Sequence, residues 1–237
     1  MISSSDMIIG AKQMHGRETN TVHAAWAKFC GLAPNHPGIA ALADESIPLQ
    51  LRDRATLINQ GDKPDTVFLV LTGELKVVKY SENGHEVWLA SISRGDLVGE
   101  IGSLIGTERT STIVATSDCQ MLALSSHQFE VIAARFSEVS RAIMGLLARR
   151  LQGTTEQLSE LVAMPVAARL HAELIRVAQV SALDSELLEI PPEVTVSALG
   201  ERIHATREAT SRAMSALEKR GLVSRRSHPW TVLLPQI

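Results

Sequence analysis

The sequence predicts an α+β protein in which an antiparallel β domain, a long helix and a second domain with a helix-turn-helix follow one another. Three observations support this order. Glycines recur at positions 61, 73, 84, 95 and 106, at intervals of 12, 11, 11 and 11 residues. An apolar heptad pattern without proline runs through residues 137–162. Two short helical segments, each preceded by a threonine, then lead into a glycine and a β-rich end.

Composition places the chain among globular proteins. The 237 residues are 45% hydrophobic and 21% charged, which suits two modest domains with packed cores. No apolar run approaches the roughly 18 residues of a membrane-spanning helix. The N-terminus lacks the basic region and the long apolar run of a secretion signal. We therefore expect a cytoplasmic protein that does not contact membranes.

Cysteine and histidine usage argues against a metal centre. The two cysteines, Cys30 and Cys119, lie far apart, so no disulfide is expected in a reducing compartment. Two thiols also cannot hold a four-thiolate iron–sulfur cluster. The eight histidines show no i, i+3 or i, i+4 pairing and no grouping with cysteine, so no metal site is expected.

Charge is distributed unevenly along the chain. The net charge is −3, but residues 195–237 carry seven Lys or Arg and three acids, and the other 194 residues carry −7. A basic tail on an acidic body is typical of a module that binds a polyanion. A solvated basic helix face would give the same count, so charge alone leaves both interpretations open.

The first half of the chain is predicted to be mostly β. Residues 1–46 are expected to be irregular apart from a short helix over residues 21–30. Between residues 47 and 125, short runs rich in Val, Leu and Thr alternate with glycine turns. Asn83–Gly84 predicts a hairpin between residues 75–80 and 86–89. Strands at this regular spacing indicate a sandwich or a barrel.

A helical region follows, in which Ser126 is expected to cap a short helix before the long one. The long helix carries an apolar seam with alternating spacings of three and four residues, which favours a two-helix dimer interface over an ordinary intradomain helix. Ile143, Leu146 and Val162 are expected to widen this face toward their own domain. The seam consists of Met144, Leu147, Leu151, Thr154, Leu158 and Leu161.

Pro165 is predicted to end the long helix, because the residue before a proline disfavours the α conformation. A helix over residues 166–181, a polar loop, two short helices and a β wing over residues 222–223 and 230–234 should follow. Thr195 and Thr206 are the expected N-caps of the two short helices, and Gly221 ends the second. The expected core positions are Leu199, Ile203, Ala213, Met214 and Leu217.

Residues 99–112 carry the chemistry of an anion site. Their glycines allow backbone amides to approach a phosphate, and Arg109 offers a planar donor fork for its oxygens. Glu100 would repel a phosphate and suits a ribose hydroxyl instead. Thr110 can donate to the phosphate or to a base edge. A glycine-rich corner of a β domain without a ligand is the plainer alternative.

The second short helix carries the chemistry of base recognition. Arg207, Glu208, Ser211 and Arg212 occupy the face opposite the core, within the first two turns. Arginine can grip guanine O6 and N7 as a fork, and glutamate can accept from cytosine N4. A solvated helix face is again the plainer alternative.

Both segments resemble motifs of one family. Residues 99–112 resemble the phosphate-binding cassette of cyclic-nucleotide-binding domains. Residues 206–212, Thr-Arg-Glu-x-x-x-Arg, resemble the recognition helix of the cyclic-AMP receptor protein/FNR superfamily. The resemblance spans residues 50–235. The chain departs from it at Ala209, which replaces a family hydroxyl that contacts phosphate, and in the cassette loop between Glu100 and Arg109, which is one residue shorter than in the best-known bacterial member.

The resemblance implies a domain organisation and a nucleotide site. An N-terminal arm (1–46) would precede a cyclic-nucleotide-binding β-roll (47–132), a dimerisation helix (133–164) and a winged helix-turn-helix DNA-binding domain (165–237). Glu100 would bind the ribose 2′-hydroxyl and Arg109 the cyclic phosphate. Residues 149–156 resemble the family's dimer helix, in which two adjacent hydroxyl residues contact the base, one from each subunit. By position, Thr154 would bind the base of its own subunit and Thr155 the base of the other. The implied ligand-binding set is Gly99, Glu100, Ile101, Gly102, Arg109, Thr110, Thr154 and Thr155.

The resemblance also implies a homodimer that binds double-stranded DNA at a palindrome of TGTGA-like half-sites, with RNA polymerase as a further partner. Cyclic AMP is favoured as the ligand, and cyclic GMP competes because Thr110 can bond a syn guanine. A weak nucleotide binder that senses another effector is a further alternative. No catalytic constellation is present, so an enzyme is not expected. The implied DNA-binding set is Thr195, Thr206, Arg207, Glu208, Ser211 and Arg212.

Overall fold

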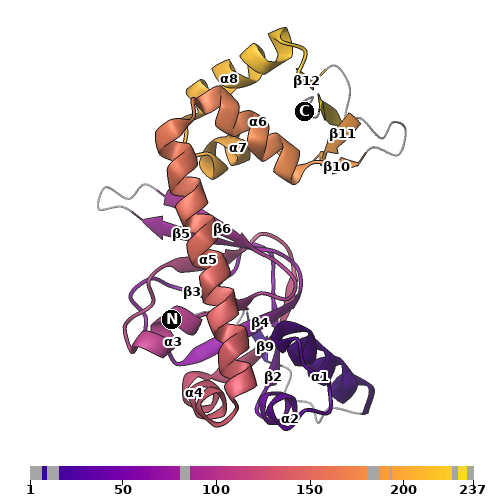
Figure 1. Ribbon diagram of the computed structural model, residues 1–237, viewed down its shortest axis with the longest axis vertical. Coiled ribbons are helices and arrows are strands. Elements are labelled where there is room, and N and C mark those ends of the chain that lie inside the picture. The colour runs from indigo at the N-terminus through magenta and orange to yellow at the C-terminus, as the bar shows by residue number, and fades with distance from the viewer. Residues whose placement is uncertain are drawn as a thin grey trace. The chain divides into compact units, whose positions relative to one another are not determined.

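A computed structural model describes residues 7–9, 16–80, 86–180, 187–192, 194–225 and 229–233. The chain divides into two compact units, Met1–Arg150 and Leu151–Ile237. Figure 1 shows the element order, with helix α5 (Ser137–Ala163) contributing to both units.

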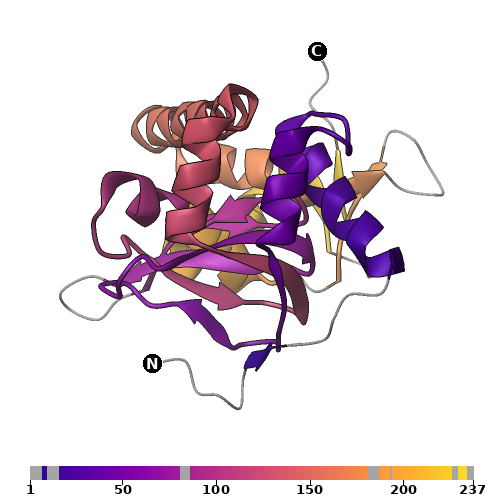
Figure 2. The same cartoon turned by 90° about the horizontal axis from the view of Figure 1, so that it is seen from below.

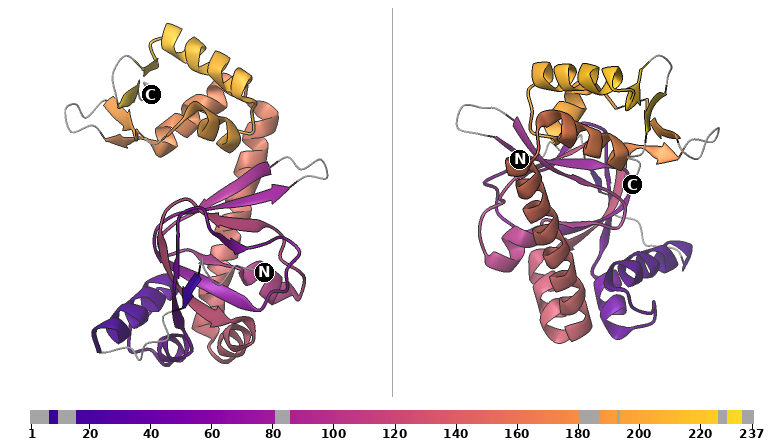
Figure 3. Two further views of the ribbon diagram at one scale, coloured as in Figure 1. Left: turned by 180° about the vertical axis from the view of Figure 1, so that it is seen from behind. Right: turned by 45° about the horizontal axis from the view of Figure 1, so that its top comes forward.

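The first unit is built on two antiparallel sheets, as the regular glycine spacing predicts. The first sheet has the order β1 (Met7–Ile9), β2 (Ile47–Leu51), β9 (Cys119–Ser125), β4 (Thr66–Thr72), β7 (Leu97–Val98). The second has the order β3 (Thr56–Ile58), β8 (Thr112–Ala115), β5 (Leu75–Tyr80), β6 (Glu86–Ile92). Buried side chains from both sheets, including Leu57, Leu75 and Met121, form one apolar core. Figure 3 shows the strands from behind.

The predicted glycine turns are present wherever the structure describes them. Gly61, Gly73, Gly95 and Gly106 all have positive φ. At Gly73 an added Cβ would lie 2.4 Å from the Asp118 carbonyl oxygen, so glycine is needed there for space as well. The Asn83–Gly84 turn lies outside the described residues, although β5 and β6 on either side of it pair as predicted.

The helix predicted over residues 21–30 is present as part of α1 (Gly16–Cys30), which begins five residues earlier. The expectation that the rest of the arm is irregular is wrong, because α2 (Pro37–Asp44) follows, and Trp26 of α1 is fully buried. The indole Nε1 of Trp26 donates to Ser46 Oγ at 2.8 Å, and that hydroxyl donates to the Leu42 carbonyl at 2.6 Å. The proline and glycine that begin α2 resemble a loop in sequence, yet proline suits the first turn of a helix.

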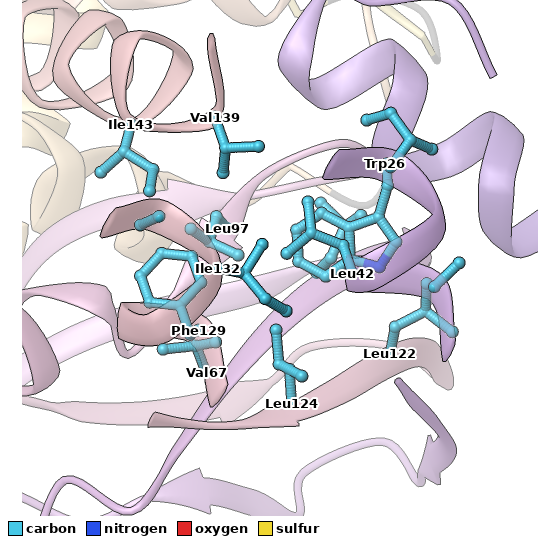
Figure 4. Close-up of a cluster of buried hydrophobic side chains, with 14 of the residues drawn as sticks. Trp26, Leu42, Val67, Leu97, Leu122, Leu124, Phe129, Ile132, Val139 and Ile143 are labelled. Carbon is cyan, nitrogen blue, oxygen red and sulfur yellow. The ribbon is translucent and has the colours of Figure 1, made fainter. Parts of the chain in front are cut away.

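Helices α1, α2, α4 (Ser126–Arg135) and the start of α5 pack on one face of the five-stranded sheet (Figures 2 and 4). The N-cap of α4 is Ser125, whose Oγ accepts from the Gln128 amide at 3.2 Å, and not Ser126 as expected. Ser126 is buried in the first turn. The shared core is formed by Trp26, Leu42, Val67, Leu97, Leu122, Leu124, Phe129, Ile132, Val139 and Ile143, among others.

Helix α5 presents two different apolar faces. Ile143 and Leu146 are buried in the core of the first unit, as predicted. Three seam residues are open, with Met144 61%, Leu151 70% and Leu158 62% exposed. Leu147, also predicted for the seam, is partly buried and packs against the core of the first unit instead. Val162 is 83% exposed, so its predicted place toward the domain is wrong. Val162 follows Met144 by five helical turns of about 3.6 residues each, so the two side chains lie on the same side of α5.

The second unit packs three helices against a small sheet (Figure 1). The helices are α6 (Val166–Val177), α7 (Val196–Arg202) and α8 (Arg207–Lys219). The sheet has the order β10 (Gln179–Val180), β11 (Leu187–Ile190), β13 (Trp230–Leu233), β12 (Val223–Ser224). Helix α6 ends four residues before its predicted end, because Gln179 and Val180 form strand β10 and pair with β11. The predicted core residues of the two short helices are all buried.

Candidate nucleotide site and DNA interface

The predicted cassette is a short helix, α3 (Glu100–Ile105), with a glycine at each end. Gly99 at the N-cap has φ 83°, and Gly106 at the C-cap has φ 66°. A Cβ at Gly99 would lie 2.8 Å from Arg109 Nη1 and 2.9 Å from the Thr66 carbonyl oxygen. Position 99 therefore requires glycine both for its backbone conformation and for space.

Arg109 is held at this helix N-terminus. Only 6% of the residue is exposed. Its Nη1 donates to the Gly99 carbonyl at 2.7 Å, and its Nη2 donates to the Thr66 carbonyl at 2.5 Å. These bonds use two of the five N–H donors of the guanidinium. Burial lowers the pKa of Arg109, and the charges of Asp65, Asp62 and Glu100 oppose that shift.

Arg109 also lines a hollow of about 560 Å³, a size typical of small-molecule sites. Polar groups of Asp62, Asp65 and Thr66 share its wall with apolar side chains of β2, β3, β4 and β9. Asp65 Oδ1 lies 3.7 Å from Arg109 Nη2, but Asp65 is exposed, so this pair stabilises little. The guanidinium thus meets both the α3 N-terminus and a hollow of ligand size.

Glu100, the other chemical group of the cassette, is 1% exposed and forms an ion pair with Arg150 of α5. Arg150 Nη2 also donates to the Leu97 carbonyl at 2.6 Å. A buried carboxylate requires such a partner, since an unpaired buried charge is costly. Arg150 therefore ties the cassette to α5, a role that sequence reasoning did not assign to it.

The structure brings Gly99, Glu100, Gly102, Arg109 and Thr110 together around α3. Gly102 is buried, and Thr110 is exposed directly beside Arg109. Ile101 is exposed on the outer face of α3. Thr154 and Thr155 are exposed on the part of α5 that belongs to the second unit, and Thr155 Oγ1 donates to the Leu151 carbonyl at 2.9 Å.

In the second unit, α7 and α8 form the predicted helix-turn-helix. Thr195 Oγ1 accepts from the Ala198 amide at 3.1 Å, and Thr206 Oγ1 accepts from the Ala209 amide at 3.2 Å. Both threonines are therefore N-caps. The two helices approach closely at Gly200, where a Cβ would lie 2.9 Å from Thr210 Oγ1. Gly200 and the fully buried Thr210 set this crossing, and the sequence did not single them out.

The outer face of α8 is polar and open. Arg207, Glu208, Ser211 and Arg212 are all exposed in its first two turns. At the other end of the helix, Glu218 pairs with Arg225, which directly follows β12. This ion pair links the end of α8 to the wing.

The turn between α7 and α8 contains His204 at φ 51°, one of two described non-glycine residues with positive φ. Burial lowers the pKa of His204, and the charge of Arg169 lowers it further. Arg169 is buried, and its Nη1 donates to the Leu161 carbonyl at 3.2 Å. Sequence reasoning predicted a tight turn here but gave His204 no role.

Two family models match the chain in the order that the motifs predict. The cyclic nucleotide-binding domain matches residues 48–136, and the Crp-like helix-turn-helix domain matches residues 168–236. The chain belongs to the cyclic-AMP receptor protein/FNR superfamily. Members of this superfamily are transcription regulators, and this one combines a cyclic-nucleotide-binding domain with a DNA-binding domain and is not an enzyme.

Relatives of this CRP/FNR regulator cover most of its length. The cAMP-activated global transcriptional regulators of Pasteurella multocida and Salmonella typhimurium are 28% and 26% identical over 182 residues, 76% of this chain and 86% of theirs. The c-di-GMP responsive global regulator CLP of Xanthomonas campestris shares the fold. The superposition has a TM-score of 0.70 at 20% sequence identity, and it covers 84% of this chain and 99% of that one.

None of the described helices of this CRP/FNR chain has the length and apolar character needed to span a bilayer. No group of three or more His, Cys, Asp or Glu side chains in the described part of the chain is arranged to hold a metal ion. Cys30 and Cys119 are free thiols, and burial raises the pKa of Cys30 to about 12.

Proposed function

We propose that this regulator is a cytoplasmic homodimer that binds cyclic AMP at the α3 cassette and, with the nucleotide bound, binds a palindromic operator of TGTGA-like half-sites. The observation that carries the proposal is the buried guanidinium of Arg109, fixed on the Gly99 and Thr66 carbonyls at the N-terminus of α3. A fixed cation beside free helix amides suits a singly charged cyclic phosphate.

The cassette assigns a part of the ligand to each residue. Arg109 and Thr110 bind the phosphate, supported by backbone amides of Gly99, Ile101 and Gly102. Glu100 accepts from the ribose 2′-hydroxyl while Arg150 keeps its charge balanced. Because Glu100 is acceptor-only when ionised, it favours a hydroxyl and disfavours a second phosphate at that end of the ligand.

The open seam of α5 supports the homodimer. Met144, Leu151 and Leu158 follow one another at intervals of seven residues, and each is more than half exposed. Large exposed apolar side chains at this spacing are typical of a helix that pairs with a second copy. Thr154 follows Arg150 by one helical turn and shares its side of the helix. We infer that Thr154 contacts the base held by its own subunit, and that Thr155 contacts the base held by the other.

The exposed face of α8 supports the assignment of DNA contacts. Arg207 and Arg212 offer forks for guanine, and Glu208 can accept from cytosine. Ser211, Thr206 and Thr195 lie near the N-termini of α8 and α7, where contacts to phosphate are common. In a dimer, two such helices about 34 Å apart would meet successive major grooves.

Nucleotide binding is proposed to shift the dimer toward the arrangement of DNA heads that fits the operator, which is a population shift. The Glu100–Arg150 ion pair gives the cassette a direct connection to the helix that carries the seam. RNA polymerase is proposed as the partner that a DNA-bound dimer contacts.

Calorimetry with cyclic AMP, cyclic GMP and cyclic di-GMP tests the ligand. We expect cyclic AMP to bind most tightly, and Arg109→Gln to abolish its binding while the variant keeps its fold. Cyclic GMP is the second candidate, because Thr110 is exposed and its hydroxyl can bond a guanine edge. Failure of all three nucleotides to bind would overturn the proposal.

A further inference from the structure

A second hollow lies between the end of α1 and the first turns of α5, away from the cassette. Its volume is about 540 Å³, within the range of small-molecule sites. We call it the α1–α5 hollow. It is lined by Lys28, Phe29, Cys30, Gly31, Leu32, Glu138, Arg141, Ala142, Gly145 and Arg149.

The charged groups of this lining are three cations and one acid. Lys28, Arg141 and Arg149 are exposed, and no salt bridge joins any of them to an acid within the described ranges. The first unit as a whole holds slightly more acids than bases. Three cations line this hollow, and the charge of Glu138 attracts only one of them, Arg141. An anion placed among the cations would reduce the repulsion between their like charges.

Gly145 leaves this hollow open. Glycine inside a helix lowers its stability, and crowding does not require glycine here. An added Cβ would meet only Arg149 Nη1, at 3.4 Å, which is ordinary contact. Any longer side chain at position 145 would extend into the hollow from the helix surface.

We propose that the α1–α5 hollow binds a compact oxyanion with at least two phosphate or carboxylate groups. Arg141 and Arg149 supply planar forks for its oxygens, and Lys28 supplies a mobile ammonium from α1. Phe29, Leu32 and Ala142 form an apolar wall for the rest of the ligand. The ligand joins α1 to the helix that carries the seam, so its binding would add a second input to the regulator.

Inorganic pyrophosphate and citrate are the probes, titrated by calorimetry at low ionic strength into the full chain. We expect at least one of them to bind, and the comparison shows whether phosphate or carboxylate chemistry is preferred. Arg141→Gln and Arg149→Gln should each weaken binding by about fivefold, the effect of one charge-assisted bond at a partly open site. Lys79→Gln, which removes an exposed cation of β5, is the matched control and should change nothing.

Two further variants give results that a loss of folding cannot imitate. Glu138→Gln removes the only acid of the lining and should strengthen binding. Gly145→Met fills the hollow while improving helix propensity, so it should abolish binding and raise the melting temperature. Gly153→Met, on the same helix but outside the hollow, should raise the melting temperature and leave binding intact.

The Arg109→Gln variant separates this site from the cassette, because pyrophosphate or citrate binding should persist in it. No binding of either probe would overturn the proposal. It would equally be overturned if Lys79→Gln weakened binding as much as Arg141→Gln, since the probes would then report only general surface charge.

Discussion

Arg109 Nη1 donates to the Gly99 carbonyl at 2.7 Å, and the same nitrogen occupies the space that any side chain at position 99 would need. The cassette arginine and the cassette glycine therefore fix each other. The bond places the guanidinium at the N-terminus of α3, and the positive φ of Gly99 turns the chain into that helix.

Gly99→Ala should weaken both the fold and the nucleotide site. It adds a collision with Arg109 and the Thr66 carbonyl to the cost of a left-handed backbone, for a loss of about 3 kcal/mol in the free energy of unfolding. Gly95→Ala is the control, since Gly95 also has positive φ but no neighbour within 4 Å of a Cβ. It should cost only about 1 kcal/mol. Equal losses in urea denaturation would contradict the account of Gly99.

Arg150→Met should leave the buried Glu100 without its partner. We expect a loss of about 3 kcal/mol in the free energy of unfolding at pH 7, because an uncompensated charge remains in the core. The double variant Glu100→Gln/Arg150→Met should be more stable than Arg150→Met alone. If it were no more stable, the ion pair would not be the source of the effect.

His204 should make the stability of the second unit depend on pH. Its pKa is lowered in the folded chain, so the unfolded chain binds the proton more readily. Above the ordinary histidine pKa of about 6.5, His204 is neutral in both states and costs the folded chain nothing. As pH falls below that value, the unfolded chain takes up the proton first, and the free energy of unfolding decreases. His204→Asn, which tolerates positive φ, should lose less stability than the native chain between pH 6.5 and 5. Parallel pH profiles in chemical denaturation would refute this role.

Arg207→Ala should cost about 1–3 kcal/mol of operator binding and reduce discrimination between operator and unrelated DNA. Nucleotide affinity should be unchanged, because Arg207 lies on the exposed face of α8. Lys219→Ala, at the opposite end of the same helix, is the control and should leave discrimination intact. Fluorescence anisotropy at fixed salt measures the affinity of each variant for operator and for unrelated DNA. An equal loss of discrimination in the two variants would contradict base reading by Arg207.

Much of the fold was predictable because its turns and caps use residues with special backbone properties. The glycines with positive φ mark the ends of strands, and Thr195 and Thr206 mark the starts of α7 and α8. Helix α2 and the first turn of α1 were not predicted, because these helices are stabilised by burial of Trp26 and Leu42 in a core shared with distant segments, and not by a long apolar stripe of their own.

The site was predictable in its residue types but not in its connections. The residues around Arg109 indicated an anion site. Nothing in the local sequence showed that Glu100 would pair with Arg150, which lies 50 positions later. The close approach of Gly200 and Thr210, and the position of Arg169 beside His204, likewise depend on tertiary packing. The spacing of residues within one segment does not predict its contacts with a distant segment.

The most direct test of the central claim is the affinity of the purified protein for a palindromic TGTGA-like operator, measured at fixed salt with and without saturating cyclic AMP. We predict tight, specific binding only with the nucleotide. The Thr155→Ala variant should lose most of this activation while keeping the affinity of the nucleotide-free protein. Equal operator affinity in the presence and absence of cyclic AMP would contradict the claim that occupation of the cassette controls the DNA-binding unit.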